Sequence, residues 1–158
     1  MSNVEPSDWS DIEAWDRHHA ATSMGERIEA ARRALRYVPD LEANRLRRVW
    51  FAGCGTSLAP RAYAELGFDV VASDLSAEAV DAQWQSSVGV SAELLGVLYE
   101  QAVSGLAPER GGKLSVVTHD LSKPFAEGDF DCVLNIRSFV GFAPAVMQAI
   151  AASHHAAL

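Results

Sequence analysis

The sequence predicts a doubly wound α/β fold, which is a mostly parallel, Rossmann-like sheet with helices on both faces. Three observations lead to this prediction. From residue 48 onward, short apolar runs alternate with segments of helical periodicity, the pattern of βαβ units. The runs are continuously apolar, as expected of strands buried on both faces. The first run stops at Gly53-Cys54-Gly55 and the second at Asp74, and open α/β sheets bind ligands beyond such strand ends.

The composition indicates one globular domain. The 158 residues suffice for a single hydrophobic core, and 49% hydrophobic with 22% charged residues is ordinary globular usage. The formal net charge of −8 argues against nucleic acid as a partner. No run approaches the ~18 apolar residues of a membrane helix, the acidic N-terminus lacks a signal-peptide pattern, and the two cysteines fit a reducing compartment. We therefore expect a cytoplasmic protein without membrane association.

The chain before the first apolar run is predicted to be helical. Ser10 or Asp11 is expected to cap a short helix that reaches Ala21. A second helix is expected over about 26–37, because its apolar residues recur at spacings of three and four, and Pro39 is expected to end it. The charged residues that follow are expected to form a solvated approach to the first strand.

The rest of the chain is predicted to hold four strands and their connecting helices. The strands are expected at residues 49–52, 68–73, 114–118 and 130–136. A helix over 56–66 would end at Gly67, and Ser76 is a predicted N-cap for a helix that reaches about residue 85. Residues 86–112 exceed a minimal βαβ unit and are expected to add a helix and a loop, as a lid or as packing. We divide the chain into a helical cap, 1–47, and a core, 48–158.

The residues most suited to bind a ligand stand at the ends of the first two predicted strands. In Gly53-Cys54-Gly55-Thr56, the glycines allow a tight turn and a close approach of a ligand to the backbone, and the following helix start offers free N–H groups. Cys54 is either a small residue in this turn or a thiol whose ionisation the helix start favours. Asp74 is placed to accept hydrogen bonds from the two hydroxyls of an adenosine ribose, or to form an Asx turn. Leu58 stands where a dinucleotide fingerprint has its third glycine, which argues against NAD or FAD.

Four blocks of the sequence, at residues 49–57, 68–76, 119–125 and 130–135, resemble in order the motifs of class I S-adenosylmethionine-dependent methyltransferases of the small-molecule type. The resemblance implies strands in the order 3-2-1-4, S-adenosylmethionine as cofactor, and methyl transfer to an oxygen, nitrogen or sulfur atom of a small molecule. It also implies cofactor contacts along the blocks: the methionine part over Gly53, Cys54, Gly55 and Thr56, the ribose at Asp74 and Leu75, the adenine at Asp120 and Leu121, and the sulfonium near Asn135.

The catalytic residues are not assigned by this resemblance. The segment Trp15–His19 loosely resembles an element that closes over the cofactor or substrate in related enzymes, so His18 and His19 are candidate bases, with Asn135 as a third candidate. Surface histidines on an amphipathic helix explain the same pattern. No metal site is expected, because the histidine pairs are adjacent rather than spaced i, i+4.

Three departures from the family pattern leave alternatives open. Phe51 stands where the family usually has an acidic residue, and the segment after Asn135 lacks the signature of nucleic-acid amino-group methylators. The chain is expected to be truncated on its C-terminal side, which leaves the fourth strand as an edge that a homodimer partner or the last helix would cover. A non-catalytic binding module is therefore the alternative function, and another nucleotide-binding Rossmann-like domain is a third.

Overall fold

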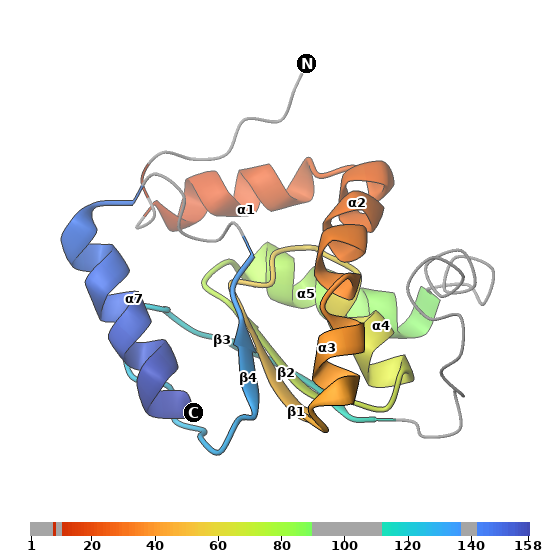
Figure 1. Cartoon of the computed structure of the whole chain (residues 1–158). Helices are drawn as coiled ribbons and strands as arrows, with labels where there is room; N and C mark the ends of the chain where they lie inside the picture. The colour runs from red at the N-terminus through yellow and green to blue at the C-terminus, as the bar shows by residue number, and fades with distance from the viewer. Residues whose placement is uncertain (1–7, 9–10, 90–111, 137–141) are drawn as a thin grey trace.

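The computed structural model describes residues 8, 11–89, 112–136 and 142–158, and it shows a parallel sheet between two layers of helices (Figure 1). The strands are β1 (Arg48–Ala52), β2 (Asp69–Asp74), β3 (Leu114–Thr118) and β4 (Cys132–Leu134). They pair in parallel in the order β3-β2-β1-β4. This arrangement confirms the predicted doubly wound fold and its strand order.

The helices are α1 (Ile12–Ala20), α2 (Met24–Leu35), α3 (Val38–Ala43), α4 (Ala59–Glu65), α5 (Ala77–Gly89) and α7 (Pro144–Ala157). Side chains alternate across β1, because successive residues of a strand point to opposite faces. Val49 and Phe51 join the core under α2, α3 and α4, whereas Trp50 and Ala52 join a smaller core with Ala157 of α7. The two faces of one strand therefore build two separate cores.

The N-terminal helices differ from expectation at their junctions. Asp11 caps α1 as predicted, since its carboxylate accepts a hydrogen bond from Ala14 N at 2.9 Å. The second helix begins at Met24, two residues early, because Ser23 and Glu26 form a capping box. The expectation that Pro39 only ends a helix is wrong, because Pro39 lies in the first turn of α3. Proline fits there, since the first turn of a helix has no use for its missing N–H.

The core elements are shifted or shortened relative to the prediction. Helix α4 begins at Ala59 rather than residue 56, and the residues between form a turn. Gly67, with φ of 94°, ends this helix region as predicted. Ser76 caps α5 as predicted through Ala79 N at 3.2 Å, and α5 continues to Gly89. Strand β4 is shorter than the predicted run, and most of the predicted 86–112 insertion lies outside the described residues.

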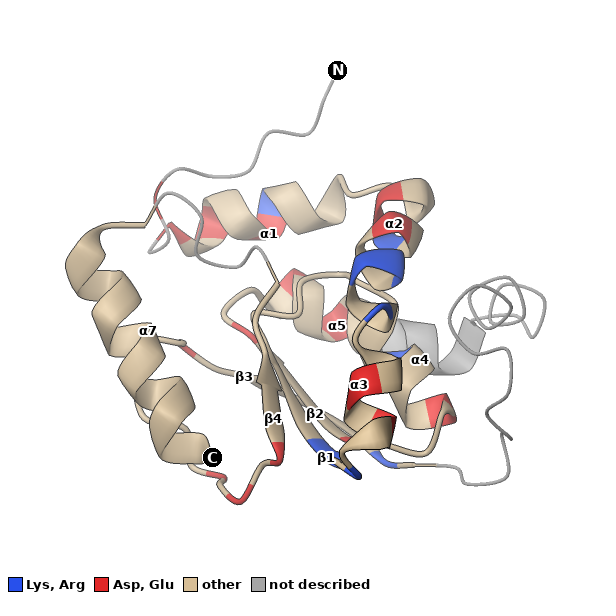
Figure 2. Ribbon diagram, in the orientation of Figure 1, with Lys and Arg blue, Asp and Glu red and all other residues tan. Residues whose placement is uncertain are grey.

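Helix α7 packs against the face of the sheet opposite α4 and α5, and it carries no Lys, Arg, Asp or Glu (Figures 1 and 2). Phe130 N donates to the carbonyl of Ala157 at 3.1 Å, which fixes the end of α7 beside the start of β4. Among the described strands, β4 pairs only with β1, so α7 covers a face of the sheet and does not pair with its edge. No helix in the described parts of the chain is long and apolar enough to cross a bilayer.

Candidate functional site

The loop after β1 has the conformation that its glycines allow. Gly53 and Gly55 have φ of 65° and 52°, in the left-handed region that side chains disfavour. A Cβ on Gly55 would lie 3.1 Å from Cε1 of His19. The loop therefore needs glycine at this position for its backbone conformation and for the close approach of α1.

Asp74 ties the end of β2 to this loop. Its Oδ2 accepts a hydrogen bond from Gly55 N at 2.8 Å, and its Oδ1 accepts one from Ser76 N at 3.0 Å. The second bond is the Asx turn considered from the sequence. Each carboxylate oxygen has further lone pairs, so these bonds leave acceptor capacity for a ligand. The Asx turn and a ligand-binding role are thus compatible.

Two side chains that the sequence analysis did not single out hold the loop from the other side. Gln83 of α5 is fully buried, and its Nε2 donates to the carbonyls of Gly55 at 2.9 Å and Ser57 at 2.7 Å. Arg27 of α2 donates from Nε to the carbonyl of Thr56 at 2.7 Å. The capping box at Ser23 could have been recognised in the sequence, and it places Arg27 in the first turn of α2. No local sequence signal, however, predicts that Arg27 or Gln83 contacts the loop.

A cavity of about 560 Å³ opens at this end of the sheet, within the size range of small-molecule sites. Ten of the residues that the sequence analysis proposed line it: His18, His19, Gly53, Cys54, Gly55, Thr56, Asp74, Leu75, Asp120 and Leu121. Asn135 is not among the lining residues, although its neighbours Leu134 and Ile136 are. Successive residues of an extended segment point to opposite sides, so the expectation that Asn135 faces the reacting centre receives no support from the cavity.

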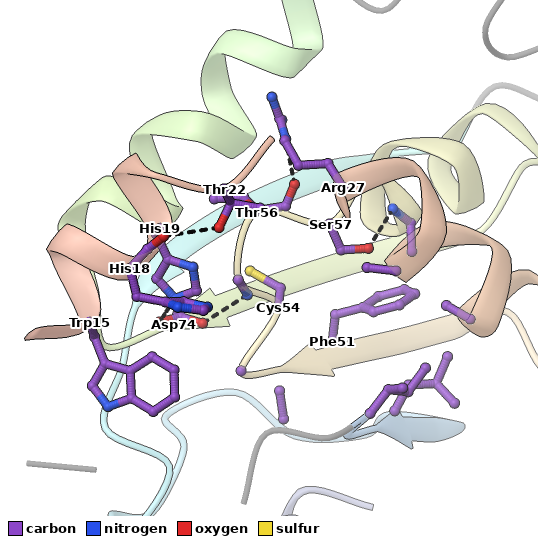
Figure 3. A pocket seen from close by; sticks show the side chains of 18 of the residues that line it. Trp15, His18, His19, Thr22, Arg27, Phe51, Cys54, Thr56, Ser57 and Asp74 are labelled. Carbon is purple, nitrogen blue, oxygen red and sulfur yellow. Dashed lines mark hydrogen bonds and ion pairs between the residues drawn. The ribbon is translucent and has the colours of Figure 1, made fainter. Parts of the chain in front are cut away.

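Helix α1 closes one side of the cavity. In Figure 3, Trp15, His18 and Asp74 lie on one side of Cys54, and Phe51 lies on the other. The Trp15 ring stacks on His19 at 5.8 Å between centroids, and Nε2 of His19 lies 3.9 Å from Oδ1 of Asp74. The histidines of the predicted closing element therefore belong to the site rather than to the outer surface.

The electrostatics of the loop decide between two interpretations of Cys54. The thiol is buried, and desolvation together with the negative charge of Asp74 raises its pKa well above the ordinary value. The favoured thiolate considered from the sequence is therefore wrong, and Cys54 serves as a small neutral residue in the turn. In the described part of the chain, no group of three or more His, Cys, Asp or Glu side chains is arranged to hold a metal ion.

Comparison with known families decides the identity of the fold. Residues 51–155, more than half of the chain, match a family described as a methyltransferase domain. The chain belongs to the class I S-adenosylmethionine-dependent methyltransferases. The matched region begins inside β1 and ends inside α7, so it contains the glycine loop and Asp74. No curated protein matches the chain significantly.

Solved methyltransferases share the fold. A TehB-like S-adenosylmethionine-dependent methyltransferase from Corynebacterium glutamicum is 23% identical, with a TM-score of 0.54 over 88% of this chain and 59% of its own. The glycopeptide N-methyltransferase MtfA, complexed with S-adenosylmethionine, is 16% identical, with a TM-score of 0.56 over 78% of this chain and 49% of its own. Magnesium protoporphyrin IX methyltransferase from Synechocystis, with bound S-adenosylmethionine, is 17% identical, with a TM-score of 0.53 over 96% of this chain and 72% of its own.

These similarities establish the fold of this methyltransferase domain and nothing about an acceptor. The chain spans 59% and 49% of the first two of these proteins, so it corresponds to about half of their length. The family's cofactor is S-adenosylmethionine, and the described site fits a group of that kind, because a glycine loop free of Cβ atoms and an adjacent carboxylate line the same cavity.

Proposed function

We propose that this methyltransferase domain transfers a methyl group from S-adenosylmethionine to an oxygen, nitrogen or sulfur atom of a small molecule. One observation carries the proposal: the backbone N–H of Gly55 and the carboxylate of Asp74 are hydrogen-bonded at 2.8 Å on the wall of a cavity of about 560 Å³. That volume suits a small ligand rather than a polymer, and the net charge of −8 disfavours nucleic acid.

The proposed cofactor contacts follow the lining of the cavity. The loop 53–56 would lie under the methionine part, and Asp74, with Leu75 beside it, would accept hydrogen bonds from the ribose hydroxyls. Asp120 and Leu121 would frame the adenine. The Oδ1 of Asp120 already accepts hydrogen bonds from the N and Oγ of Ser122, which fixes the turn that presents both residues.

The chain's own residues contribute alignment and a dry site. When bound, S-adenosylmethionine supplies a methyl group that its positively charged sulfur already activates. The protein therefore has to orient the acceptor and exclude water. Trp15 and Phe51 line the cavity with apolar surface, which helps to exclude water. Both His18 and His19 line the cavity, but His19 is packed between Trp15 and Asp74. We therefore assign His18 as the residue that takes up the acceptor's proton.

We further propose that residues 1–47 act as a cap on the core 48–158, and that a second copy of the chain covers the β4 edge in a cytoplasmic homodimer. Contacts of α1 with Asp74 support the cap, and the β4 edge, unpaired within the described sheet, supports the dimer. Sedimentation of the purified chain as a monomer, without aggregation, would contradict the proposed homodimer.

The direct test is a thermal shift with S-adenosylmethionine and, as a control, NAD. Binding to the native state raises the melting temperature, so a shift of several degrees is expected with the first compound and none with NAD. Release of S-adenosylhomocysteine with small-molecule acceptors would then demonstrate transfer. Binding without turnover across a broad acceptor panel would favour the non-catalytic module, which Phe51 in the place of an acidic residue also favours. No shift with the cofactor would contradict the proposal.

A further inference from the structure

A second arginine lines the cavity away from the glycine loop. Arg33 lies in the last turn of α2, whereas Arg27, which holds the loop, lies in its first turn. At 1.5 Å per residue, the two positions are about 9 Å apart along the helix axis. Figure 2 shows basic residues on the part of α2 that leads into α3. Arg33 therefore belongs to a part of the cavity wall distinct from the loop.

The guanidinium of Arg33 has unused hydrogen-bond donors. Its Nε is buried and donates to no described group. Its nearest carboxylate, that of Glu29, lies 3.9 Å from Nη1, beyond hydrogen-bond distance, and the same carboxylate lies 3.7 Å from Nη1 of Arg32. A buried donor without a protein partner is unusual in a native structure, and the Arg33 side chain is 33% exposed, so a water or a ligand in the cavity can reach it.

Most other charged side chains on the cavity wall are already held by the protein. The Glu26 carboxylate accepts a hydrogen bond from Ser23 N at 2.7 Å, and Arg27 donates to the loop. Asp74 and Asp120 accept backbone N–H groups. Of the arginines that line the cavity, Arg33 is thus the one with a buried donor left for a ligand.

The chemistry around Arg33 defines the ligand. Apolar residues of α2, of β1, of β4 and of the segment after β4 line the same cavity and belong to or pack against one core: Ala34, Phe51, Leu134 and Ile136. A ligand there needs an apolar body, and a guanidinium fork matches a carboxylate with two parallel hydrogen bonds. We propose that Arg33 binds a carboxylate of the methyl acceptor, which makes the acceptor a small organic acid with an apolar body. This inference rests on the proposed function.

The carboxylate has a second possible source, the methionine end of the cofactor. The position of Arg33 favours the acceptor, because the proposed methionine end lies over the loop that Arg27 contacts, about 9 Å along α2. The two sources differ in one measurable property. A cofactor carboxylate would make the affinity for S-adenosylhomocysteine depend on Arg33, and an acceptor carboxylate would not.

The test is calorimetry on the full chain saturated with S-adenosylhomocysteine. The probes are benzoate, salicylate and hexanoate, each against its primary amide, which has the same shape without the charge. We expect at least one acid to bind about tenfold more tightly than its amide, as a charge-assisted hydrogen bond allows. Arg33→Gln should abolish this preference, and Arg32→Gln, on the exposed side of the same helix, should keep it. Arg33→Lys, which keeps the charge without the fork, should keep part of it.

Three outcomes would overturn the inference. They are the absence of any preference for acid over amide in the wild-type chain, a preference that survives in Arg33→Gln, and a loss of S-adenosylhomocysteine affinity in Arg33→Gln but not in Arg32→Gln. The last outcome would assign the carboxylate to the cofactor. If Arg33→Gln fails to fold, the preference for acid over amide is compared between the wild-type chain and Arg33→Lys. The inference is then overturned if the wild-type chain shows no preference or if Arg33→Lys keeps the full preference. If the wild-type chain does not bind S-adenosylhomocysteine at all, the proposed function itself fails.

Discussion

Asp74 shows how a single carboxylate can hold two segments of a cavity wall and keep acceptor capacity for a ligand. The side chain is 13% exposed, and its two oxygens accept N–H groups from Gly55 and Ser76. These bonds fix the direction of the carboxylate before any ligand arrives, so a ligand does not have to order it. Pre-organisation of this kind lowers the entropic cost of binding.

We predict that Asp74→Ala weakens binding of S-adenosylhomocysteine by at least about 1–3 kcal/mol, because hydrogen bonds to a charged acceptor are lost. Isothermal calorimetry measures the effect. Asp69→Ala, at the exposed start of the same strand, is the control and should bind normally. Asp74→Asn keeps an acceptor for Gly55 N. It therefore separates the effect of a disturbed loop conformation from the effect of a lost contact to the ligand. Unchanged affinity in both Asp74 variants would remove the ribose assignment.

At the scale of elements, α1 is held to the core by a polar contact that lies beside the cavity. The Oδ1 of Asp16 accepts a hydrogen bond from Ser76 Oγ at 2.6 Å, and the same hydroxyl accepts one from Ala79 N at the start of α5. Ser76 is fully buried. One serine therefore caps α5 and docks α1, so the position of α1 is coupled to the end of β2.

We predict that Asp16→Ala lowers the free energy of unfolding by about 1–3 kcal/mol, because the buried Ser76 hydroxyl loses a charged partner. Its affinity for S-adenosylhomocysteine should also fall, since α1 forms a wall of the cavity. Chemical denaturation and calorimetry measure the two effects. Glu13→Ala, on the exposed side of the same helix, serves as control and should leave both unchanged. Normal affinity in a folded Asp16→Ala variant would show that α1 does not close the site.

At the scale of the whole molecule, the face of the sheet opposite α4 and α5 holds two histidines in an aromatic cluster. The His119 ring lies 4.7 Å from Phe125 and 5.9 Å from Trp50, and the His154 ring of α7 lies 5.1 Å from Trp50. Burial lowers the pKa of both imidazoles, and for His154 the nearby His119 lowers it further. For His119, a backbone hydrogen bond with Lys123 and the charge of Asp120 act in the opposite direction.

The sign of the resulting pH dependence follows from these shifts. Above the ordinary histidine pKa of about 6.5, both imidazoles are neutral in the folded and unfolded states. As the pH falls below that value, the unfolded chain takes up protons before the folded one, so the folded state loses stability. We predict a melting temperature that falls between about pH 6.5 and pH 5, measured by thermal unfolding.

Substitutions identify the groups responsible. His154→Phe should flatten the pH dependence, whereas His155→Gln, on the exposed side of α7, should retain it. Glu26 and Asp131 have lowered pKa values because backbone N–H groups donate hydrogen bonds to their carboxylates. Their contribution to the stability of the folded state is therefore lost at a lower pH than that of the histidines. A melting temperature that stays constant from pH 7 to pH 5 would contradict the assignment.

Local sequence signals were sufficient where structure depends on neighbouring residues. The cap at Asp11, the stop at Gly67 and the cap at Ser76 were predictable, because each is a bond or a backbone preference within a few residues. Phe51 and its neighbours in β1 were recognisable as a strand by continuous apolarity. Helix α3 was missed, because a proline is compatible both with the stop of a preceding helix and with the first turn of a new one, where Pro39 lies.

By itself, the sequence determined the four strands, the helices that connect the first two strands to their successors, the glycine loop and the carboxylate at the end of β2, because these depend on residue type and short-range spacing. Only the tertiary structure decided that Gln83 and Arg27 hold the loop, that Asn135 stands outside the cavity lining, and that Arg33 has a buried donor on its wall. These facts join elements far apart in the chain. Their physical origin is the packing of helices against the sheet, which no local pattern of residues records.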